Sequence, residues 1–576
     1  MKNTEIHELN KYFILIKTIM CGIFCEIYFS KRNISKDEKL LNCIKRRGPD
    51  CINELDIEIN KNFRLFMCGC VLWMQGKKPI KQPLESDTGI LLFNGDIFNS
   101  TWGEDSDTEA LLNIFDNAMS TDHLRAQLKA LKGPFSLIYY NKHTKIMYFV
   151  RDRIGRNSLL FHKSENSYVL SNILSRKYLC SEIPASHIYE MDINKKSINL
   201  HSWETCENSQ TISLDDWIQS CQDRQSLPDE DFCFDYESSL DLNEKDSVIT
   251  HIENASLNHK NKQHIFESLL DNEVILNTVK NICKLLGRSV QVRVQTQPNK
   301  CKSCISNEET YCEHCTTGIL FSGGLDCTIL AFLADKFLPK KQPVDLINVA
   351  FKSKDSTSYD VPDRITGKQS YQELQRLCPD RLWVFHEVNV PKEQLEEYQS
   401  LIIGDLVYPR KTILDESLGS ALWFAAGAGS LSHCRILLLG SGADELFGGY
   451  VRHRNAYKRQ GWLGLSKELL LDWKRISFRN LARDNRVICD HGRQPRMPYL
   501  DEDLVEYVLN LKPWLKCYPS ETLPCGIGDK LILRLVAFQL GFVNVTFLPK
   551  RALQFGSRIA NKKEKGNDIS KTFMNT

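Results

Sequence analysis

No apolar run in this sequence approaches the roughly 20 residues that a membrane-spanning helix needs. The formal net charge is only +2 at pH 7, so charge gives no indication of a nucleic-acid or anionic-membrane partner. The apolar stretch at residues 12–16 is short, ends at Lys17 and lacks a small-residue cleavage site, which argues against a secretory signal. We therefore expect neither nucleic acid nor a membrane as a partner.

The sequence also lacks the cysteine pattern of a disulfide framework. Its 21 cysteines are odd in number and scattered, and several, such as Cys68 and Cys70, lie among apolar residues. This usage is typical of a reducing compartment, and we expect a cytoplasmic protein. With 576 residues, of which 42% are hydrophobic and 25% charged, the chain has ordinary globular composition and is long enough for two or three domains.

The central motif is a glycine-containing turn between a predicted strand and a predicted helix. Apolar residues at 319–321 precede Ser322-Gly323-Gly324, and residues 325–335 have helical apolar spacing. The glycines allow close approach of a ligand, and the free N–H groups of the turn and the helix N-terminus favour an anion. Asp326 is placed to hold the cation that accompanies a polyphosphate. This pattern predicts a phosphate-binding loop, with an ordinary strand–helix turn as the simpler alternative.

A second predicted strand ends in glycines and acids later in the chain. Apolar residues at 436–439 lead into Gly440 and then into Asp444 and Glu445. Because parallel strands end at the same edge of a sheet, Asp326 and Asp444 can meet there and share Mg²⁺ on a pyrophosphate. Taken alone, an acidic pair is more often the first turn of a helix. The two loops together favour the magnesium site.

Two Cys-x-x-Cys pairs precede the strand of the phosphate loop. A helix is predicted over residues 265–286, and the pairs that follow it are Cys301 with Cys304 and Cys312 with Cys315. Four thiolates in paired turns suit tetrahedral Zn²⁺, although the spacer between the pairs is shorter than usual. We expect either a structural zinc clip on this loop or free surface thiols.

The amino-terminal part contains motifs that are informative in combination. Cys21 follows Met20, and a cysteine that becomes the first residue can use its own α-amine as the base for its thiol. A buried apolar cysteine at the start of a strand is the usual alternative. The other motifs are RRGPD at 46–50, NGDIFN at 94–99, SDTE at 106–109 and RDRIG at 151–155. In order and spacing, residues 21–200 resemble the glutaminase domain of class II glutamine amidotransferases.

This resemblance implies roles for particular residues. Cys21 would be the nucleophile of glutamine hydrolysis, and Asn94 and Gly95 would form the oxyanion hole that stabilises the tetrahedral intermediate. Asp96 and Asp107 would bind glutamine, Asp107 through the α-amine.

Two features depart from the pattern of that family. Twenty residues precede Cys21. Either translation starts at Met20, which we favour, or the extension is removed, or the α-amine does not exist and the chemistry fails. Val71 stands where the family has the arginine that clamps the α-carboxylate of glutamine, and valine cannot form that bidentate pair. Arg64, the nearest arginine, would need a seven-residue gap to replace it. These two departures weaken the case for glutaminase activity.

The later motifs resemble the synthetase domain of asparagine synthetases. The matching segments are 322–326, 440–450, 483–487, 495–501 and the basic stretch 549–557. The resemblance implies an ATP site made by Phe321, Ser322, Gly323, Gly324, Asp326, Gly440, Lys550 and Arg551, with Mg²⁺ on Asp326 and Asp444. As a whole, the chain is similar to the asparagine synthetase domain-containing protein 1 group, a branch beside the true asparagine synthetases.

One position of the synthetase half departs from the pattern. Ser441 stands where asparagine synthetases have a glutamate that handles protons, and a neutral hydroxyl is a poor base. We expect nucleotide binding to be retained and asparagine formation to be slow or absent.

The expected architecture combines α+β and α/β parts. Residues 21–200 would form an αββα sandwich of the Ntn-hydrolase type, and residues 263–560 an ATP-pyrophosphatase-type domain with a parallel sheet, like the adenine nucleotide α-hydrolases. Residues 1–20 would be an extension, 201–262 a polar linker or insertion, and 561–576 a polar tail.

The reaction implied by the resemblance is amide formation, as in asparagine biosynthesis. ATP with Mg²⁺ would activate a carboxylate, aspartate by default, as an acyl-adenylate, and ammonia from glutamine would then displace AMP. The alternative is a degenerate synthetase that keeps nucleotide binding and acts as a scaffold. Asp326 with Asp444 favours the ligase, whereas Val71 and Ser441 favour the scaffold. The sequence names neither the acceptor acid nor a protein partner.

Overall fold

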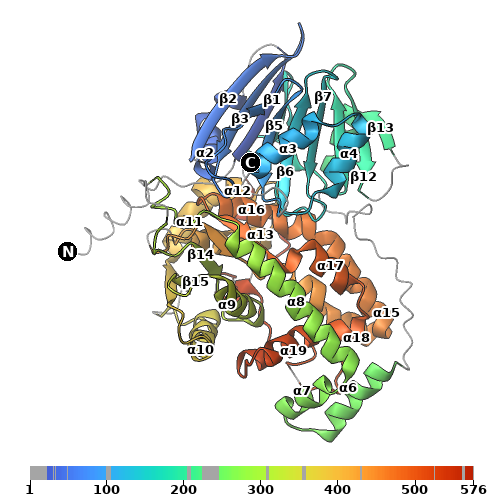
Figure 1. Cartoon of the computed structure of the whole chain (residues 1–576), viewed down its shortest axis with the longest axis vertical. Coiled ribbons are helices and arrows are strands. Elements are labelled where there is room, and N and C mark those ends of the chain that lie inside the picture. The colour runs from blue at the N-terminus through green and yellow to red at the C-terminus, as the bar shows by residue number, and fades with distance from the viewer. Residues whose placement is uncertain are drawn as a thin grey trace, which may run out of the picture.

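The computed structural model describes residues 22–574 except 30–31, 33, 49, 99–105, 204–208, 224–245, 307–310, 353–357, 429–430, 525 and 561–564. The predicted extension and Cys21 lie outside these residues. The chain forms two bodies stacked along its long axis, with the amino-terminal sheets in one and the later helices in the other (Figure 1). Within the described part, every helix is too short or too polar to cross a membrane.

Two antiparallel sheets pack face to face in the amino-terminal body. One has the strand order β10 (Cys180–Glu182), β8 (Leu160–Lys163), β9 (Ser167–Ser171), β1 (Gly22–Tyr28), β3 (Arg64–Val71), β2 (Cys51–Glu58). The other has the order β13 (Ser209–Ser213), β12 (Ser197–Ser202), β11 (His187–Asp192), β7 (Ile146–Arg151), β6 (Phe135–Asn141), β5 (Gly89–Gly95), β4 (Leu84–Glu85).

Helices cover the outer faces of both sheets, so the central strands are buried on two sides. On β1, the side chains of Ile23, Cys25 and Ile27 belong to the core between the sheets. Phe24 lies on the other face of the strand, in an apolar cluster that includes residues of α2 (Glu38–Arg47). The other sheet is covered by α3 (Asp107–Asp116), with α4 (Thr121–Ala130) beside it. This αββα arrangement confirms the predicted sandwich.

The stretch predicted as a linker contains regular structure in its described residues. Strand β13 extends the second sheet, and α5 (Leu214–Asp223) places Leu214, Trp217 and Cys221 in the core between the sheets. These three residues recur at helical spacing, which makes α5 amphipathic although its composition is polar. Helix α6 (Ser247–Asn258) then begins the second body. The linker prediction was therefore too broad, because a few well-spaced apolar residues are enough to anchor a polar segment.

A parallel sheet forms the centre of the second body. Its order is β16 (Trp383–Val390), β15 (Val344–Phe351), β14 (Thr317–Leu320), β17 (Ile436–Leu438), β18 (Gln494–Arg496). Strands β15 and β16 lie on one side of β14, and strands β17 and β18, which come later in the chain, lie on its other side. The loops after β14 and β17 therefore meet at the carboxyl edge of the sheet, at the switch point where such folds bind ligands. The predicted parallel-sheet domain is confirmed.

Helices pack around this sheet, and the long α8 runs diagonally across the body (Figure 1). The segment predicted as one helix over 265–286 forms two helices, α7 (Lys262–Leu270) and α8 (Glu273–Gln295). The chain breaks between them because the Asn272 side chain caps α8, where its Oδ1 accepts hydrogen bonds from the N–H groups of Val274 and Ile275. The remaining α-helices are α9 (Leu325–Phe337), α10 (Pro362–Leu377), α11 (Lys392–Tyr398), α12 (Gly404–Val407), α13 (Ile413–Ala426), α14 (Ala443–Phe447), α15 (Val451–Ile476), α16 (Ala482–Cys489), α17 (Glu502–Leu509), α18 (Pro513–Lys516), α19 (Leu531–Gln539) and α20 (Leu553–Gly556).

Buried arginine–carboxylate pairs join the two bodies. They are Arg496–Asp96, Arg435–Asp50, Arg156–Glu502 and Arg486–Glu182. Asp50, Asp96, Arg486 and Arg496 belong to motifs that the sequence singled out. Buried charges are tolerated only when they are paired and hydrogen-bonded, so these pairs define how the bodies dock.

Candidate active site

A cavity of about 210 Å³ opens at the carboxyl edge of the parallel sheet. The predicted ATP-site residues that line it are Phe321, Ser322, Gly324, Asp326, Gly440, Lys550 and Arg551, together with the predicted magnesium ligand Asp444. The structure thus brings together residues from three distant segments of the chain. Gly323, the remaining predicted residue, is not among the residues that line the cavity.

The glycines of the phosphate loop are required by close contacts. Gly323 has a φ of +77°, and a Cβ there would lie 2.5 Å from the Gly367 backbone. Its carbonyl accepts the hydroxyl of Ser370 at 2.6 Å, which ties the loop to α10. A Cβ on Gly440 would lie 2.9 Å from the Asp326 Cβ. The loops after β14 and β17 therefore touch, and the N-terminus of α9, where free N–H groups can favour an anion, lies at the cavity.

Lys530 lies between the two predicted metal carboxylates. Its Nζ is 2.6 Å from Asp326 Oδ2 and 2.6 Å from Asp444 Oδ1, and its side chain is almost fully buried. Lys550 Nζ lies 3.1 Å from the other oxygen of Asp444. Although burial opposes ionisation, the two lysines hold the pKa of Asp444 well below its ordinary value. Sequence reasoning missed Lys530, although Gly526 and Gly528 lie just before it in the sequence.

The carboxylates fit the magnesium ion that the family implies. Asp326 Oδ1 is buried and has no hydrogen-bond partner among the described residues. This oxygen is therefore available as a ligand atom. Carboxylate oxygens shared with phosphate are the ligands that Mg²⁺ prefers. Asp326 and Asp444 would hold the ion, while Lys530 pairs with one oxygen of each carboxylate.

The predicted basic loop lies against α10 at the mouth of the cavity. Arg551 donates to Thr366 Oγ1 at 3.2 Å. A Cβ on Gly556 would lie 1.9 Å from Asp363 Oδ1, so this part of the loop rests directly on that carboxyl. Burial raises the pKa of Asp363 to about 7, against the opposing effect of Arg551 and Lys550. Asp363 is a second cavity residue that the sequence did not indicate.

A second cavity of about 330 Å³ adjoins the first and shares Gly440, Ser441, Asp444 and Lys550 with it. Four arginines line it: Arg452, Arg475, Arg479 and Arg483. Arg452 is paired with Asp472 at 2.6 Å, and Arg483 with Asp415 and Asp484, each at 2.7 Å. The guanidinium groups of Arg475 and Arg479 have no hydrogen bond or ion pair with a described residue. The cavity therefore contains two guanidinium groups that no described residue pairs with.

Glu445 also faces the second cavity. Its Oε1 accepts the hydroxyl of Tyr450 at 2.7 Å and the amide of Asn480 at 3.1 Å. Burial, together with the neighbouring Asp444, raises the pKa of Glu445 to about 7. A carboxyl with this pKa can accept a proton near neutral pH.

The predicted oxyanion-hole residues end β5 in the amino-terminal body. The backbone oxygen of Asn94 accepts the Asn157 amide at 2.8 Å, while its own Nδ2 is buried without a partner among the described residues. Gly95 approaches Pro134 so closely that a Cβ would lie 2.2 Å from that carbonyl oxygen. An unsatisfied buried donor is costly unless a ligand uses it, which suits an oxyanion hole.

The two predicted glutamine-binding acids lie close together but differ in their partners. Asp96 is paired with Arg496 of the second body. Asp107, which follows the Ser106 N-cap of α3, accepts the N–H of Thr108 at 2.8 Å, and burial raises its pKa to about 7. Gln75 donates to both carboxylates, at 3.3 Å and 3.2 Å. Asp107 therefore has the more available carboxylate.

The position of the missing carboxylate clamp remains apolar. Val71 lines a small cavity beside Asp107 and Gly95, and among its described lining residues none is basic. Arg64 lies at the opposite end of β3, where the strand pairs with Tyr28 rather than Gly22, and its guanidinium binds Asp56 at 3.0 Å. The seven-residue step from Arg64 to Val71 corresponds to about 23 Å of extended strand. Arg64 cannot take over the clamp.

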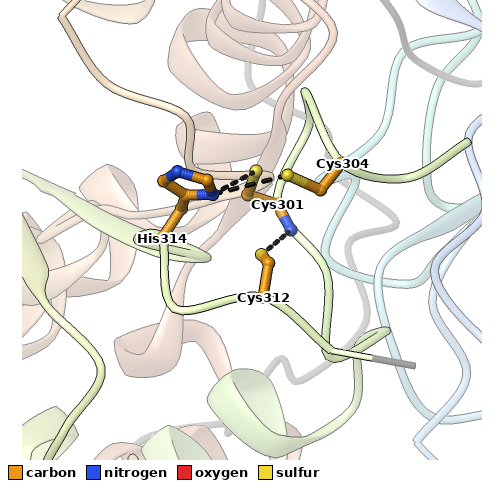
Figure 2. Close-up of side chains that lie close together, drawn as sticks. All are labelled: Cys301, Cys304, Cys312 and His314. Atoms are coloured by element: carbon orange, nitrogen blue, oxygen red, sulfur yellow. Dashed lines mark hydrogen bonds between the residues drawn. The ribbon is translucent and has the colours of Figure 1, made fainter. Parts of the chain in front are cut away.

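The predicted metal-binding cysteines form a cluster of different composition. The ligand atoms of Cys301, Cys304, Cys312 and His314 all lie within 4.8 Å of one another (Figure 2). Cys315 is not part of this group, because its thiol donates to the Thr317 carbonyl at 3.0 Å as the chain enters β14. Neighbouring residues of an extended chain point to opposite sides, so His314 takes the place that the spacing assigned to Cys315.

Comparison with known proteins supports both halves of the arrangement. Residues 313–464 and 455–540 match the asparagine synthase family, and residues 20–193 match the glutamine amidotransferase domain. The chain is 39% identical to the asparagine synthetase domain-containing protein CG17486 of Drosophila melanogaster, over 96% of this chain and 100% of that protein.

Two vertebrate relatives extend the similarity. Asparagine synthetase domain-containing protein 1 of Mus musculus is 34% identical, over 95% of this chain and 98% of that protein. The human protein of the same name is 33% identical, over 95% of this chain and 96% of that protein. The chain belongs to the asparagine synthetase domain-containing protein 1 family.

Proposed function

We propose that this protein is an ATP-dependent amide ligase that activates a carboxylic acid and joins it to ammonia. The observation that carries the proposal is the meeting of Asp326 and Asp444 around Lys530, in a cavity that Lys550 and Arg551 close. Carboxylates from two strand ends and cations beside them are what a nucleotide with its magnesium ion requires. The resemblance of both bodies to amide-forming enzymes supports the same reaction.

The first step is adenylation of the acceptor acid. A carboxylate oxygen attacks the α-phosphorus of ATP, and the bond to the leaving pyrophosphate breaks with its electron pair. Lys550 and Arg551, which line the cavity, would neutralise the charge on the departing pyrophosphate. When bound, magnesium supplies further neutralisation of phosphate oxygens.

The second step is attack of ammonia on the acyl carbon. A carbon–nitrogen bond forms, the carbon–oxygen bond to AMP breaks, and the nitrogen releases a proton to a base. Ser441 is a poor base, whereas Glu445 faces the same cavity with a pKa near neutrality. We assign the proton to Glu445.

Ammonia would come from glutamine when the α-amine of Cys21 is free. The unpartnered Nδ2 of Asn94 and the buried carboxyl of Asp107 support this source. Val71 weakens it, because the glutamine carboxylate lacks its clamp. Free ammonia is the alternative source for the same ligase.

The acceptor is an acid that carries additional negative charge, with aspartate as the default. Arg475 and Arg479 are the groups that would recognise the second anionic group of such an acid. A competing function is a nucleotide-binding scaffold that forms no amide. Ser441 and Val71 favour that alternative.

Exchange of labelled pyrophosphate into ATP tests the proposal. The exchange requires adenylation but neither ammonia nor a working glutaminase. We expect acceptor-dependent exchange with aspartate or another acidic amino acid, and loss of exchange in Asp444→Asn. A protein that binds ATP but shows no exchange with any carboxylic acid would establish the scaffold instead. Glutaminase activity is measured separately, on the full chain and on one that begins at Cys21.

A further inference from the structure

We propose that Cys301, Cys304, Cys312 and His314 bind one zinc ion, in a structural site that is separate from the amide-forming chemistry. The four residues lie in the loop between α8 and β14 (Figure 2). Three thiolates and one imidazole form a closed ligand set of the kind that structural zinc sites use.

The two distances from His314 to cysteine sulfurs match those around a tetrahedral zinc ion. Zinc bonds of about 2.3 Å to sulfur and about 2.0 Å to nitrogen place those ligand atoms about 3.5 Å apart in a tetrahedron. His314 Nδ1 lies 3.7 Å from Cys301 Sγ and 3.4 Å from Cys304 Sγ. These two separations bracket the tetrahedral value, so His314 already has ligand spacing to both sulfurs.

Backbone hydrogen bonding favours a negatively charged sulfur in the cluster. The N–H of Cys301 points at Cys312 Sγ at 3.0 Å. An N–H donor stabilises a thiolate more than a thiol, because hydrogen bonds to charged acceptors are the stronger ones. Cys301 is buried and His314 is exposed, so the site has an anchored side and a side through which the ion can enter. Binding would release the thiol protons to solvent.

The neighbouring candidate ligands already have other partners. Cys315 Sγ donates to Thr317, as described above. The His433 ring lies 5.5 Å from the His314 ring, but its Nδ1 is hydrogen-bonded to Ser303 Oγ at 2.8 Å. These two residues supply matched controls, since each lies beside the cluster without being a ligand.

The loop is attached to the residues that lead into two strands of the parallel sheet. The Lys302 N–H donates to the His433 carbonyl at 3.0 Å, just before β17. Its Nζ donates to the His491 carbonyl at 2.7 Å, just before β18. Zinc would therefore fix the amino-terminal edge of the sheet, opposite to the nucleotide cavity. This placement indicates a structural role.

Metal analysis of the full chain tests the proposal. The protein is purified under reducing conditions without added metal and dialysed, and zinc is measured by mass spectrometry. We expect about one zinc per chain, as for a tight structural site, and a decrease of more than about fivefold in Cys304→Ser and in His314→Gln. Cys315→Ala and His433→Gln should retain the metal. His314 is exposed, so its variant should fold, which circular dichroism checks.

Cobalt substitution identifies the ligands by a second readout. The Co²⁺ form should show the absorption of a tetrahedral site with sulfur ligands, and its sulfur charge-transfer band should weaken in Cys304→Ser but not in Cys315→Ala. A wild-type chain that is folded, reduced and free of zinc would overturn the proposal. So would loss of zinc in Cys315→Ala together with its retention in His314→Gln, which would indicate four cysteine ligands instead.

Discussion

Arg496 and Asp96 lie 400 residues apart in the sequence and form an ion pair that is completely buried between the two bodies. Two parallel contacts join them, from Nε at 3.0 Å and from Nη2 at 2.8 Å. The third guanidinium nitrogen of Arg496, Nη1, donates hydrogen bonds to the carbonyl oxygens of Arg293 and Thr296. Because the charges are well paired, the contact favours one docking geometry between the bodies. It ties a glutaminase motif directly to the synthetase body.

Removing one partner of this pair should destabilise the protein strongly. Arg496→Met leaves Asp96 buried without a counter-charge, a situation that costs about 3–5 kcal/mol. We expect a large fall in the denaturant midpoint, measured by circular dichroism. The double variant Arg496→Met/Asp96→Asn should recover part of this loss, because no charge is left unpaired. Arg454→Met, at an exposed position, is the control. Equal midpoints for wild type and Arg496→Met would show that the pair does not hold the interface.

Sequence reasoning located the two loops that line the cavity because local residues determine them. Gly323, Gly324 and Asp326 lie in one continuous turn, where the glycines show in the sequence that the backbone must turn tightly. The second loop repeats this pattern of glycines followed by an acid, at residues 440–444. Lys530 could not be found in this way, since its role depends on where α19 begins relative to two other segments. His314 was missed for a similar reason: the spacing of cysteines does not show the direction in which each side chain points at the entry to a strand.

The two metal carboxylates should be essential for nucleotide chemistry. Asp326→Asn and Asp444→Asn each remove a charge that magnesium and Lys530 share, and we expect pyrophosphate exchange to fall at least about 100-fold, the scale of losing one electrostatic stabiliser of a transition state. The rate of pyrophosphate exchange should also depend less on the magnesium concentration in both variants. Asp380→Asn, an exposed position on another surface, controls for general effects of losing an acid. Exchange that survives both substitutions would mean that the cavity holds the nucleotide in another way.

Glu445 should act in the second step and not in the first. Glu445→Gln removes the proposed proton acceptor, for which a loss of about 100-fold or more in amide formation is expected, while pyrophosphate exchange changes little. Glu396→Gln, on α11, should change neither rate.

The pH dependence follows from the raised pKa of Glu445. Since its pKa is about 7, the carboxyl is protonated and inactive as a base at lower pH. At a constant concentration of free ammonia, the amide-forming rate should rise with pH up to about 7 and then level off. This rise should be absent in Glu445→Gln. If exchange and amide formation fell together in that variant, the residue would be acting on adenylation.

Arg475 and Arg479, which pair with no described residue, should determine which acids are accepted. A charge-assisted hydrogen bond contributes about 1.5–3 kcal/mol, which corresponds to roughly a tenfold to hundredfold change in affinity. Arg475→Met and Arg479→Met should therefore raise the KM for an acidic acceptor in the exchange assay by about that factor, with kcat much less affected. Arg288→Met, at an exposed position of α8, should leave KM unchanged. Neutral carboxylic acids of similar size should lose little in the same variants, because they have no second anionic group for these arginines to bind. A uniform loss for acidic and neutral acceptors would assign the arginines to the shape of the cavity and not to recognition of charge.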